Sequence, residues 1–340
     1  MTIKSDSVTI REVAQKAGVS VATVSRYINR NAPISKDVAE RLKQVMTELR
    51  YVPHAAARQL ASQKTRVVGL LLNTLHNDFF VPLLNGIEAV VRKHEYNLVI
   101  ATYLIGSREM PPPIGPHNTD GMLVFSDGLS DDDLISLNDR KFPMVLVHRT
   151  PPASVKIPSV TVENKKISFE LVNHLIKVHG RKRIMLLRGP LHQEDSHWRE
   201  SGYRSALEAN GIPFDEQLVL NGDFERNTAR KVLNEFIAAE NHVSFDAIFT
   251  GDDDAAIGVL TSLRENSYRI PEDVSVVGFD DLGFSAFLTP PLTTVSAPTE
   301  TVGRIAAERL FSLFDKQYPE EDVMLLPTEL IIRRSCGCQA

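Results

Sequence analysis

Apolar residues near the start of the chain recur every three or four positions, which is the spacing of short amphipathic helices. Thr9 and Glu12 have the spacing of a capping box, and Gly18 can close this first helix. Ser20 can cap a second helix directly after the turn. The inward-facing positions are Ile10, Val13, Ala14, Ala17, Val24, Tyr27 and Ile28. This pattern predicts a helix-turn-helix, with a helical hairpin that packs on its own domain as the alternative.

A third amphipathic stretch follows, with Ser35 as its candidate N-cap and Asp37 in its first turn. Its apolar stripe consists of Val38, Leu42, Val45, Met46 and Leu49. Three such helices can enclose one small core, so we assign residues 1–52 to a helix-turn-helix domain. Residues 53–65 have helix-forming residues but too few apolar ones to hold a helix alone. We expect either a plain linker or a hinge helix that forms on contact with a partner.

The pattern changes from residue 66 onward, where continuous apolar runs alternate with amphipathic stretches. The apolar runs are VVGLLL, NLVIAT, GMLVF, PMVLV, RIMLLR, AIFTG and VSVVGF. The amphipathic stretches include residues 81–93, 165–179, 198–210, 227–240 and 255–265. This rhythm is typical of parallel sheets covered by helices on both faces, so we predict a doubly wound α/β body. Such sheets bind ligands at the carboxyl ends of their strands.

One segment of the body departs from this rhythm. Residues 107–119, SREMPPPIGPHNT, contain three consecutive prolines, which cannot run through the interior of a helix. We therefore expect a short extended loop between the second and third strands of the body. The flank of the sheet, or the dimer surface, should then be less covered there.

The distribution of charge separates the two regions. Residues 1–64 hold eleven Lys and Arg against five Asp and Glu, a net charge of +6, while the remainder carries −11. A basic head on an acidic body suits one domain that meets DNA phosphates and another that does not. The length of 340 residues fits two or three domains. The chain opens without an apolar leader and has no run that could span a bilayer, so we expect a cytoplasmic protein.

The two cysteines of the chain, Cys336 and Cys338, lie close to its C-terminal end. A disulfide framework is implausible with only two cysteines at this spacing, and a metal site would lack its other ligands in the sequence. We therefore interpret this end as a tail without chemistry. The sequence predicts no metal site and no cofactor.

Motifs along almost the whole chain resemble the lactose/galactose repressor family of bacterial transcription regulators. The resemblance begins with VTIREVAQKAGVSVATVSRYIN and YVPHAAARQLA, and it continues through DGMLVF, HGRKRIMLLRGP, RESGYRSAL, GDDDAAIG and VSVVGFDD. It implies a homodimer that reads a near-palindromic operator and a two-lobed, periplasmic-binding-protein-like body, residues 66–336, that binds a small effector. The N-lobe would comprise about 66–162 and 293–317, and the C-lobe about 163–292 and 318–336.

The resemblance assigns DNA contacts to both the helices and the hinge. The matching positions are Thr9, Ser20, Val21, Ala22, Thr23, Ser25, Arg26, Asn29, His54 and Leu60, with Leu60 as a minor-groove wedge. Physical chemistry supports part of this assignment independently. The planar fork of Arg26 pairs with guanine, and Val21 and Ala22 offer apolar contact to a thymine methyl group. The short hydroxyl side chains lie near a helix N-terminus, where phosphate is favoured.

The predicted strand ends carry side chains suited to a sugar. Carboxylates and an arginine fork can bind paired hydroxyl groups, while an aromatic face can cover a pyranose. The strand-end candidates are Phe79, Phe80, His148, Asp252 and Asp280, with Phe224 as a further aromatic face. The resemblance assigns effector contacts to Arg199, Phe224 and Asp280. Each has a plainer alternative: the two adjacent phenylalanines as core, His148 as a loop histidine and Arg199 as an ion-paired helix residue. The run Asp252-Asp253-Asp254 makes the region acidic, which favours an effector with many hydroxyl groups or a positive charge.

Two other classes of protein are less compatible with the sequence. A periplasmic transport protein would share the body but would need a signal peptide and no helix-turn-helix. An enzyme could use the clustered aspartates, but the chain has no phosphate-binding loop, no nucleophile elbow and no HExxH helix. We therefore expect a regulator and not an enzyme. The predicted function is repression of carbohydrate-catabolism genes, controlled by a sugar-like effector.

Overall fold

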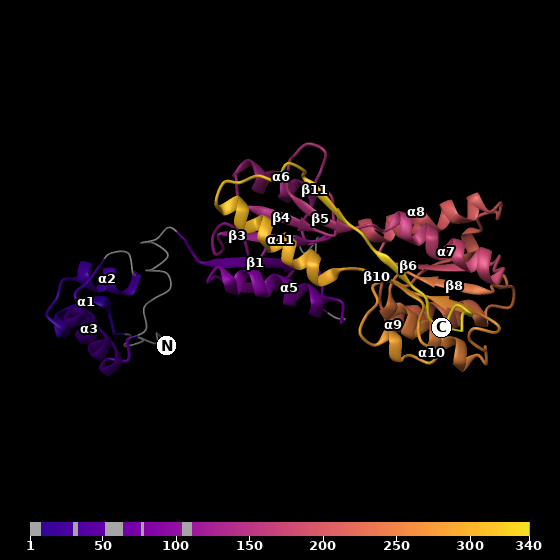
Figure 1. Cartoon of the computed structure of the whole chain (residues 1–340), viewed down its shortest axis with the longest axis horizontal. Coiled ribbons are helices and arrows are strands. Elements are labelled where there is room, and N and C mark those ends of the chain that lie inside the picture. The colour runs from indigo at the N-terminus through magenta and orange to yellow at the C-terminus, as the bar shows by residue number, and fades with distance from the viewer. Residues whose placement is uncertain (1–7, 30–32, 52–63, 76–77, 104–110, 340) are drawn as a thin grey trace. The chain divides into compact units, whose positions relative to one another are not determined.

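The computed structural model describes residues 8–29, 33–51, 64–75, 78–103 and 111–339. The chain divides into two compact units, Met1–Arg66 and Val67–Ala340. Figure 1 shows the elements of each unit. Among the described residues, no helix combines the length and the apolar character that crossing a membrane requires.

The first unit contains helices α1 (Ile10–Ala17), α2 (Val21–Asn29) and α3 (Lys36–Glu48). The predicted capping box is present, because Thr9 and Glu12 each bond the other's backbone amide. Gly18 ends α1 in the left-handed region, with φ of 65°, and the Ser20 hydroxyl accepts from the Thr23 amide at 3.1 Å. Ser35 stands at the N-cap of α3, but its side chain makes no capping bond. The buried core consists of Val13, Ala14, Ala17, Val24, Leu42 and Val45, which confirms the predicted three-helix head.

The N-lobe of the second unit is built on a six-stranded parallel sheet with the order β11-β5-β4-β3-β1-β2. Its strands are β1 (Val67–Leu72), β2 (Asn97–Thr102), β3 (Gly121–Phe125), β4 (Met144–Val147), β5 (Ser159–Val162) and β11 (Val323–Leu326). Helices α5 (Phe80–Lys93) and α11 (Thr299–Phe314) share the apolar core on one face, and α6 (Asp131–Asp139) contributes to the core on the other. Alternate strand residues point to the two cores, which explains why these strands are apolar throughout.

The C-lobe repeats this architecture with a four-stranded parallel sheet in the order β7-β6-β8-β9. Its strands are β6 (Ile184–Arg188), β7 (Val219–Asn221), β8 (Ala247–Thr250) and β9 (Ser275–Val277). Helices α7 (Lys165–His179) and α8 (Glu194–Ala209) enclose one core with the sheet, and α9 (Arg226–Ala238) and α10 (Asp253–Glu265) enclose the other. The two parallel-sheet lobes confirm the predicted α/β body.

Two later segments of the chain pass between the lobes. They contain β10 (Thr294–Ser296) and β12 (Glu329–Ile331), which pair as antiparallel strands. The lobe boundary expected after residue 317 is wrong, because β11 lies at the edge of the N-lobe sheet. Parallel pairing with β5 holds it there, and the Ser159 amide bonds the Asp322 carbonyl at 2.7 Å. This strand is not predicted from the sequence, because VMLL is a short apolar run without the following helix that marks the other strands.

The proline-rich segment is described from residue 111 onward, and residues 111–119 contain no helix, as expected. Ile114 anchors this loop in the N-lobe core, where its Cδ1 would lie 2.8 Å from a Cβ added to Gly69 of β1. The neighbouring edge strand β2 is poorly covered, with 42% of Val99 and 38% of Ile100 exposed. This part of the flank is therefore open in the way the prolines predict.

Candidate functional site

The surface of α2 presents one continuous group of side chains away from the core of the head. Val24 is fully buried, whereas Val21 is 42% exposed and Ala22 and Arg26 are also exposed. Ser20 is exposed, and its hydroxyl contacts the Thr23 hydroxyl at 2.9 Å. The beginning of α2 therefore displays apolar, hydroxyl and guanidinium groups together, which are the groups that DNA bases and phosphates accept.

The other predicted DNA contacts have different positions in the head. Thr9 is exposed, but its hydroxyl and amide bond the Glu12 carboxylate at 2.9 and 2.6 Å. Ser25 is half-buried on α2, and Asn29 is the last residue of that helix. His54 and Leu60 lie outside the described residues, so their assignments stay predictions.

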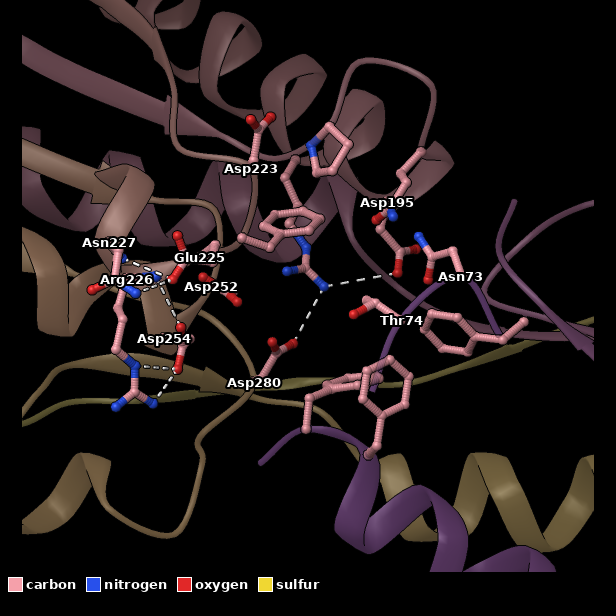
Figure 2. A pocket seen from close by; sticks show the side chains of 17 residues that line it. Asn73, Thr74, Asp195, Asp223, Glu225, Arg226, Asn227, Asp252, Asp254 and Asp280 are labelled. Atoms are coloured by element: carbon pink, nitrogen blue, oxygen red, sulfur yellow. Dashed lines mark hydrogen bonds and ion pairs between the residues drawn. The ribbon is translucent and has the colours of Figure 1, made fainter. Parts of the chain in front are cut away.

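A cavity of about 570 Å³ lies between the two lobes of the second unit, at the carboxyl ends of their strands. Figure 2 shows the side chains around it. The N-lobe contributes Asn73, Thr74, Phe79, Phe80 and Phe125. The C-lobe contributes Pro190, Gln193, Asp195, Arg199, Asp223, Phe224, Glu225, Arg226, Asn227, Asp252, Asp254 and Asp280. The cavity therefore joins an aromatic wall on one lobe to a charged wall on the other.

Arg199 is the central cation of this cavity, and only 3% of it is exposed. Its Nε donates to Asn164 Oδ1 at 2.9 Å, and its Nη1 donates to the Gly251 carbonyl at 2.6 Å. Its Nη2 donates to Asp280 Oδ1 at 3.3 Å and lies 3.9 Å from Asp195 Oδ2. A guanidinium group carries five N–H bonds, so these contacts fix its orientation and leave donor capacity toward the cavity.

Phe224 forms a face of the cavity because two glycines allow its ring to lie against the backbone. A Cβ on Gly189 would lie 2.1 Å from this ring, and a Cβ on Gly251 would lie 2.6 Å from it. Asp223 and Phe224 both adopt the left-handed region, with φ of 54° and 56°. This tight turn points the ring toward Arg199, whose guanidinium carbon is 5.4 Å from the ring centroid. The turn therefore places the Phe224 ring as an aromatic surface beside the fixed guanidinium group of Arg199.

The carboxyl groups of the cavity differ in their electrostatic surroundings. Burial raises the pKa of Asp252 well above its ordinary value, and the nearby Asp280 raises it further. Burial also raises the pKa of Asp280, although Arg199 opposes this change. For Asp195, burial alone would raise the pKa, but His148, Arg199 and Asn164 outweigh it and lower the value. The cavity therefore combines two carboxyl groups whose pKa burial raises with a third, Asp195, whose pKa its partners lower.

Two further carboxylates are occupied by the protein itself. Asp254 accepts from the Arg226 amide at 2.9 Å and from its Nε at 3.0 Å. Glu225 caps α9 by accepting from the amides of Asn227 and Thr228. Asp252 likewise caps α10 by accepting from the Ala255 amide at 2.8 Å. The acidic run that the sequence suggested for ligand binding is thus partly structural, and Asp253 lies outside the cavity.

The structure brings six of the seven sequence-predicted effector residues to the cavity. They are Phe79, Phe80, Arg199, Phe224, Asp252 and Asp280. Phe79 and Phe80 also belong to the N-lobe core, so they are core residues and part of the cavity wall at the same time. His148 corrects the prediction, because it is buried behind Phe79 and its Nδ1 bonds Asp195 Oδ2 at 2.7 Å. It orients a cavity carboxylate and does not line the cavity.

Sequence reasoning missed Asp195, Asn164 and Gln193. Asp195 lies one helical turn before Arg199 on α8, a spacing that places both side chains on one face. That spacing was the available signal. Asn164 ends the segment after β5 and bonds both Asp195, at 2.8 Å, and Arg199. Nothing in the local pattern distinguishes it from an ordinary loop asparagine.

A three-helix head with an exposed second helix, joined to a two-lobed body with a polar cavity, defines a ligand-responsive DNA-binding regulator. Comparison with known proteins places the chain within this class. Bacterial regulatory proteins of the lacI family match residues 9–54, and the periplasmic binding protein-like domain matches residues 172–336.

The similar proteins extend over nearly the whole chain. The chain is 32% identical to the HTH-type transcriptional regulator RegA of Clostridium saccharobutylicum over 331 residues, 96% of this chain and 98% of the other. It is 30% identical to the repressor CytR of Escherichia coli K12, covering 96% of each. The chain therefore belongs to the lacI family of transcriptional regulators.

Two solved structures are similar in both sequence and fold. The lac repressor dimer bound to operator and the anti-inducer ONPF shares 25% identity, with a TM-score of 0.81 over 97% of this chain and 99% of that one. The complex of the transcriptional regulator CelR with cellobiose shares 29% identity, with a TM-score of 0.67 over 96% and 99%.

Proposed function

We propose that this protein is a repressor that binds a palindromic operator as a homodimer. A sugar-like effector in the inter-lobe cavity would either lower or raise its affinity for the operator. The regulated genes would encode carbohydrate catabolism, and the protein would act in the cytoplasm. The observation that carries this proposal is the fixed Arg199 guanidinium between Asp280 and the Phe224 ring.

The chemistry of the cavity matches a polyhydroxylated ligand. Arg199 supplies N–H donors, while Asp252 and Asp280 supply carboxyl oxygens that can accept from ligand hydroxyl groups. Phe224 supplies an apolar face for the C–H side of a sugar ring. A volume of about 570 Å³ falls within the usual range for small-molecule sites. The solved complex of a similar regulator with cellobiose supports the same chemical class.

For the head, we propose that α2 enters the major groove. Arg26 would read guanine through its fork, and Val21 and Ala22 would contact thymine methyl groups. The hydroxyl groups of Ser20, Thr23 and Ser25 would position the helix against phosphates. Thr9, Asn29, His54 and Leu60 complete the proposed contact set, with Leu60 as a minor-groove wedge. We further propose residues 1–52 as the DNA-binding domain and 53–65 as the hinge.

A thermal-shift screen of sugars and nucleosides against the full chain tests the ligand class, because a ligand that binds only the folded state raises the melting temperature. We expect one sugar to raise the melting temperature of the wild type and not that of Asp280→Ala. Asp273→Ala is the matched control, since Asp273 lies in the C-lobe outside the cavity and pairs with Arg269. It should respond like the wild type.

The outcomes separate the parts of the proposal. A response to a nucleoside alone would contradict the sugar assignment while keeping the cavity. Equal sugar responses in the wild type and Asp280→Ala would place the ligand elsewhere. Gel shifts of genomic fragments that contain palindromes, with and without the identified sugar, test the regulatory role; no sequence-specific retardation at low salt would contradict it.

A further inference from the structure

The two C-terminal cysteines, for which the sequence indicates no further metal ligands, lie beside two histidines in the structure. His174 and His179 belong to α7 of the C-lobe, and Cys336 and Cys338 belong to the end of the chain. One nitrogen from each histidine and the sulfur of each cysteine all lie within 4.8 Å of one another. The expectation that a metal site would lack its other ligands is therefore wrong, because folding brings them from another element of the C-lobe.

The distances among His174, His179 and Cys338 match one face of a tetrahedron around a small cation, and the sulfur of Cys336 lies within 4.8 Å of all three ligand atoms. His174 Nε2 and His179 Nε2 are 3.3 Å apart. Cys338 Sγ lies 3.7 Å from His174 Nε2 and 3.4 Å from His179 Nε2. Metal–nitrogen bonds of about 2.05 Å and metal–sulfur bonds of about 2.3 Å imply tetrahedral edges of about 3.3 Å for N–N and about 3.6 Å for N–S. All three observed edges agree with these values to within about 0.2 Å.

The backbone around the cluster is shaped to allow this approach. Helix α7 ends at His179, and Gly180 follows it as the C-cap with φ of 66°. Gly337 has φ of 116°, and a Cβ on it would lie 2.9 Å from His179 Nδ1. A glycine between the cysteines therefore satisfies both the left-handed backbone and the close contact with the imidazole ring.

Neighbouring groups hold Cys336 in place. Cys336 is fully buried, and its carbonyl accepts from the Ser275 hydroxyl at 2.7 Å. The Thr293 hydroxyl donates to Cys336 Sγ at 3.1 Å, which favours the thiolate form that binds metals. The two imidazole Nε2 atoms face each other without an acidic partner in the cluster. A cation between them could be bound by both nitrogen atoms.

We propose that His174, His179, Cys336 and Cys338 bind one Zn²⁺ in a closed structural site. Two thiolates and two imidazoles are a ligand set that zinc prefers, and four protein ligands leave no position for a substrate. The site would fasten the C-terminal segment, which follows β12, to α7. It would stabilise the C-lobe and take no part in effector chemistry.

The first test measures zinc in the full-length protein, produced without a histidine tag and purified without chelators. Mass spectrometry of the metal content should find one zinc per chain in the wild type. Cys338→Ser and His179→Gln should lose it, whereas His197→Gln should keep it, because His197 is exposed on α8 outside the cluster. Zinc retained at the wild-type level in both cluster variants would overturn the proposal.

A second readout identifies the ligands and does not depend on natural loading. Co²⁺ added to the zinc-free wild type should give thiolate-to-cobalt charge-transfer absorption and the strong visible bands of a tetrahedral ion, and Cys338→Ser should lose the charge-transfer band. Removal of zinc should lower the melting temperature of the wild type and leave that of Cys338→Ser unchanged, which also shows that the variant folds. Absent cobalt bands, or a native Cys336–Cys338 disulfide detected by mass, would overturn the proposal.

Discussion

Replacing Arg199 by methionine should destabilise the C-lobe, and the loss should grow as pH rises. Methionine keeps an unbranched apolar stem that can still pack on Phe279, whose ring centroid is 3.6 Å from the guanidinium carbon. It removes the bonds to Asn164, Gly251 and Asp280. Breaking a buried ion pair by deleting one partner typically costs about 3–5 kcal/mol. We expect a loss of this size at about pH 8.

The pH dependence follows from Asp280. Burial already raises the pKa of its carboxyl group in the folded protein, and Arg199 works against that rise. Without Arg199, the folded pKa moves further above the unfolded value. A raised carboxyl pKa means that the folded state holds its proton more tightly, so stability is retained at low pH and lost as pH rises through the folded pKa. The loss caused by Arg199→Met should therefore be about 1–2 kcal/mol smaller at pH 5.5 than at pH 8.

Urea unfolding followed by tryptophan fluorescence measures this change directly, because the one tryptophan, Trp198, precedes Arg199 on α8. Arg204→Met on the same helix is the matched control. Its half-exposed side chain pairs with Glu200, so its loss should be at most about 1 kcal/mol and constant over this pH range. Adding Asp280→Asn to Arg199→Met should restore about 1–2 kcal/mol of the free energy of unfolding at pH 8. A pH-independent loss, or strict additivity in the double variant, would refute the electrostatic account.

Two other predictions concern the head and the C-lobe core. Arg26→Ala should weaken operator binding by about 1–3 kcal/mol per half-site and relax preference at one base pair, measured on substituted operators; an unchanged preference would remove Arg26 from base reading. Burial raises the pKa of Asp253 to about 7, so the free energy of unfolding should fall by about 2 kcal/mol as the pH rises from 5 to 7. Urea titrations over this pH range should show a flatter dependence for Asp253→Asn. An equally steep slope in the variant would assign the titration to another group.

Much of the fold could be predicted from the sequence because its signals are local. The capping box of α1 and the glycine that ends it are contained within ten residues, and both are present. The apolar runs of the body become parallel strands because burial on both faces requires continuous apolar sequence. Strand β11 was missed for the opposite reason: only its pairing with a distant strand, β5, identifies it.

The candidate site shows the same division between local and long-range information. Arg199 and Phe224 could be named because the motifs around them resemble a known family. The role of His148 depends on Asp195, which another lobe supplies, so a strand-end position alone could not exclude it from the cavity. The cysteines illustrate the limit most clearly. Their two histidine neighbours lie on α7, far away in sequence, and no spacing rule connects them.

The most direct test of the account is whether a ligand in the inter-lobe cavity controls operator binding through Asp280. Operator DNA should be titrated with the wild type and Asp280→Ala at rising concentrations of the ligand found by thermal shift. The effector-free affinity of the variant should stay within about threefold of the wild type, because the head is unchanged, while the ligand should no longer alter it. If Asp280→Ala responds at the same ligand concentration as the wild type, the cavity is not the regulatory site.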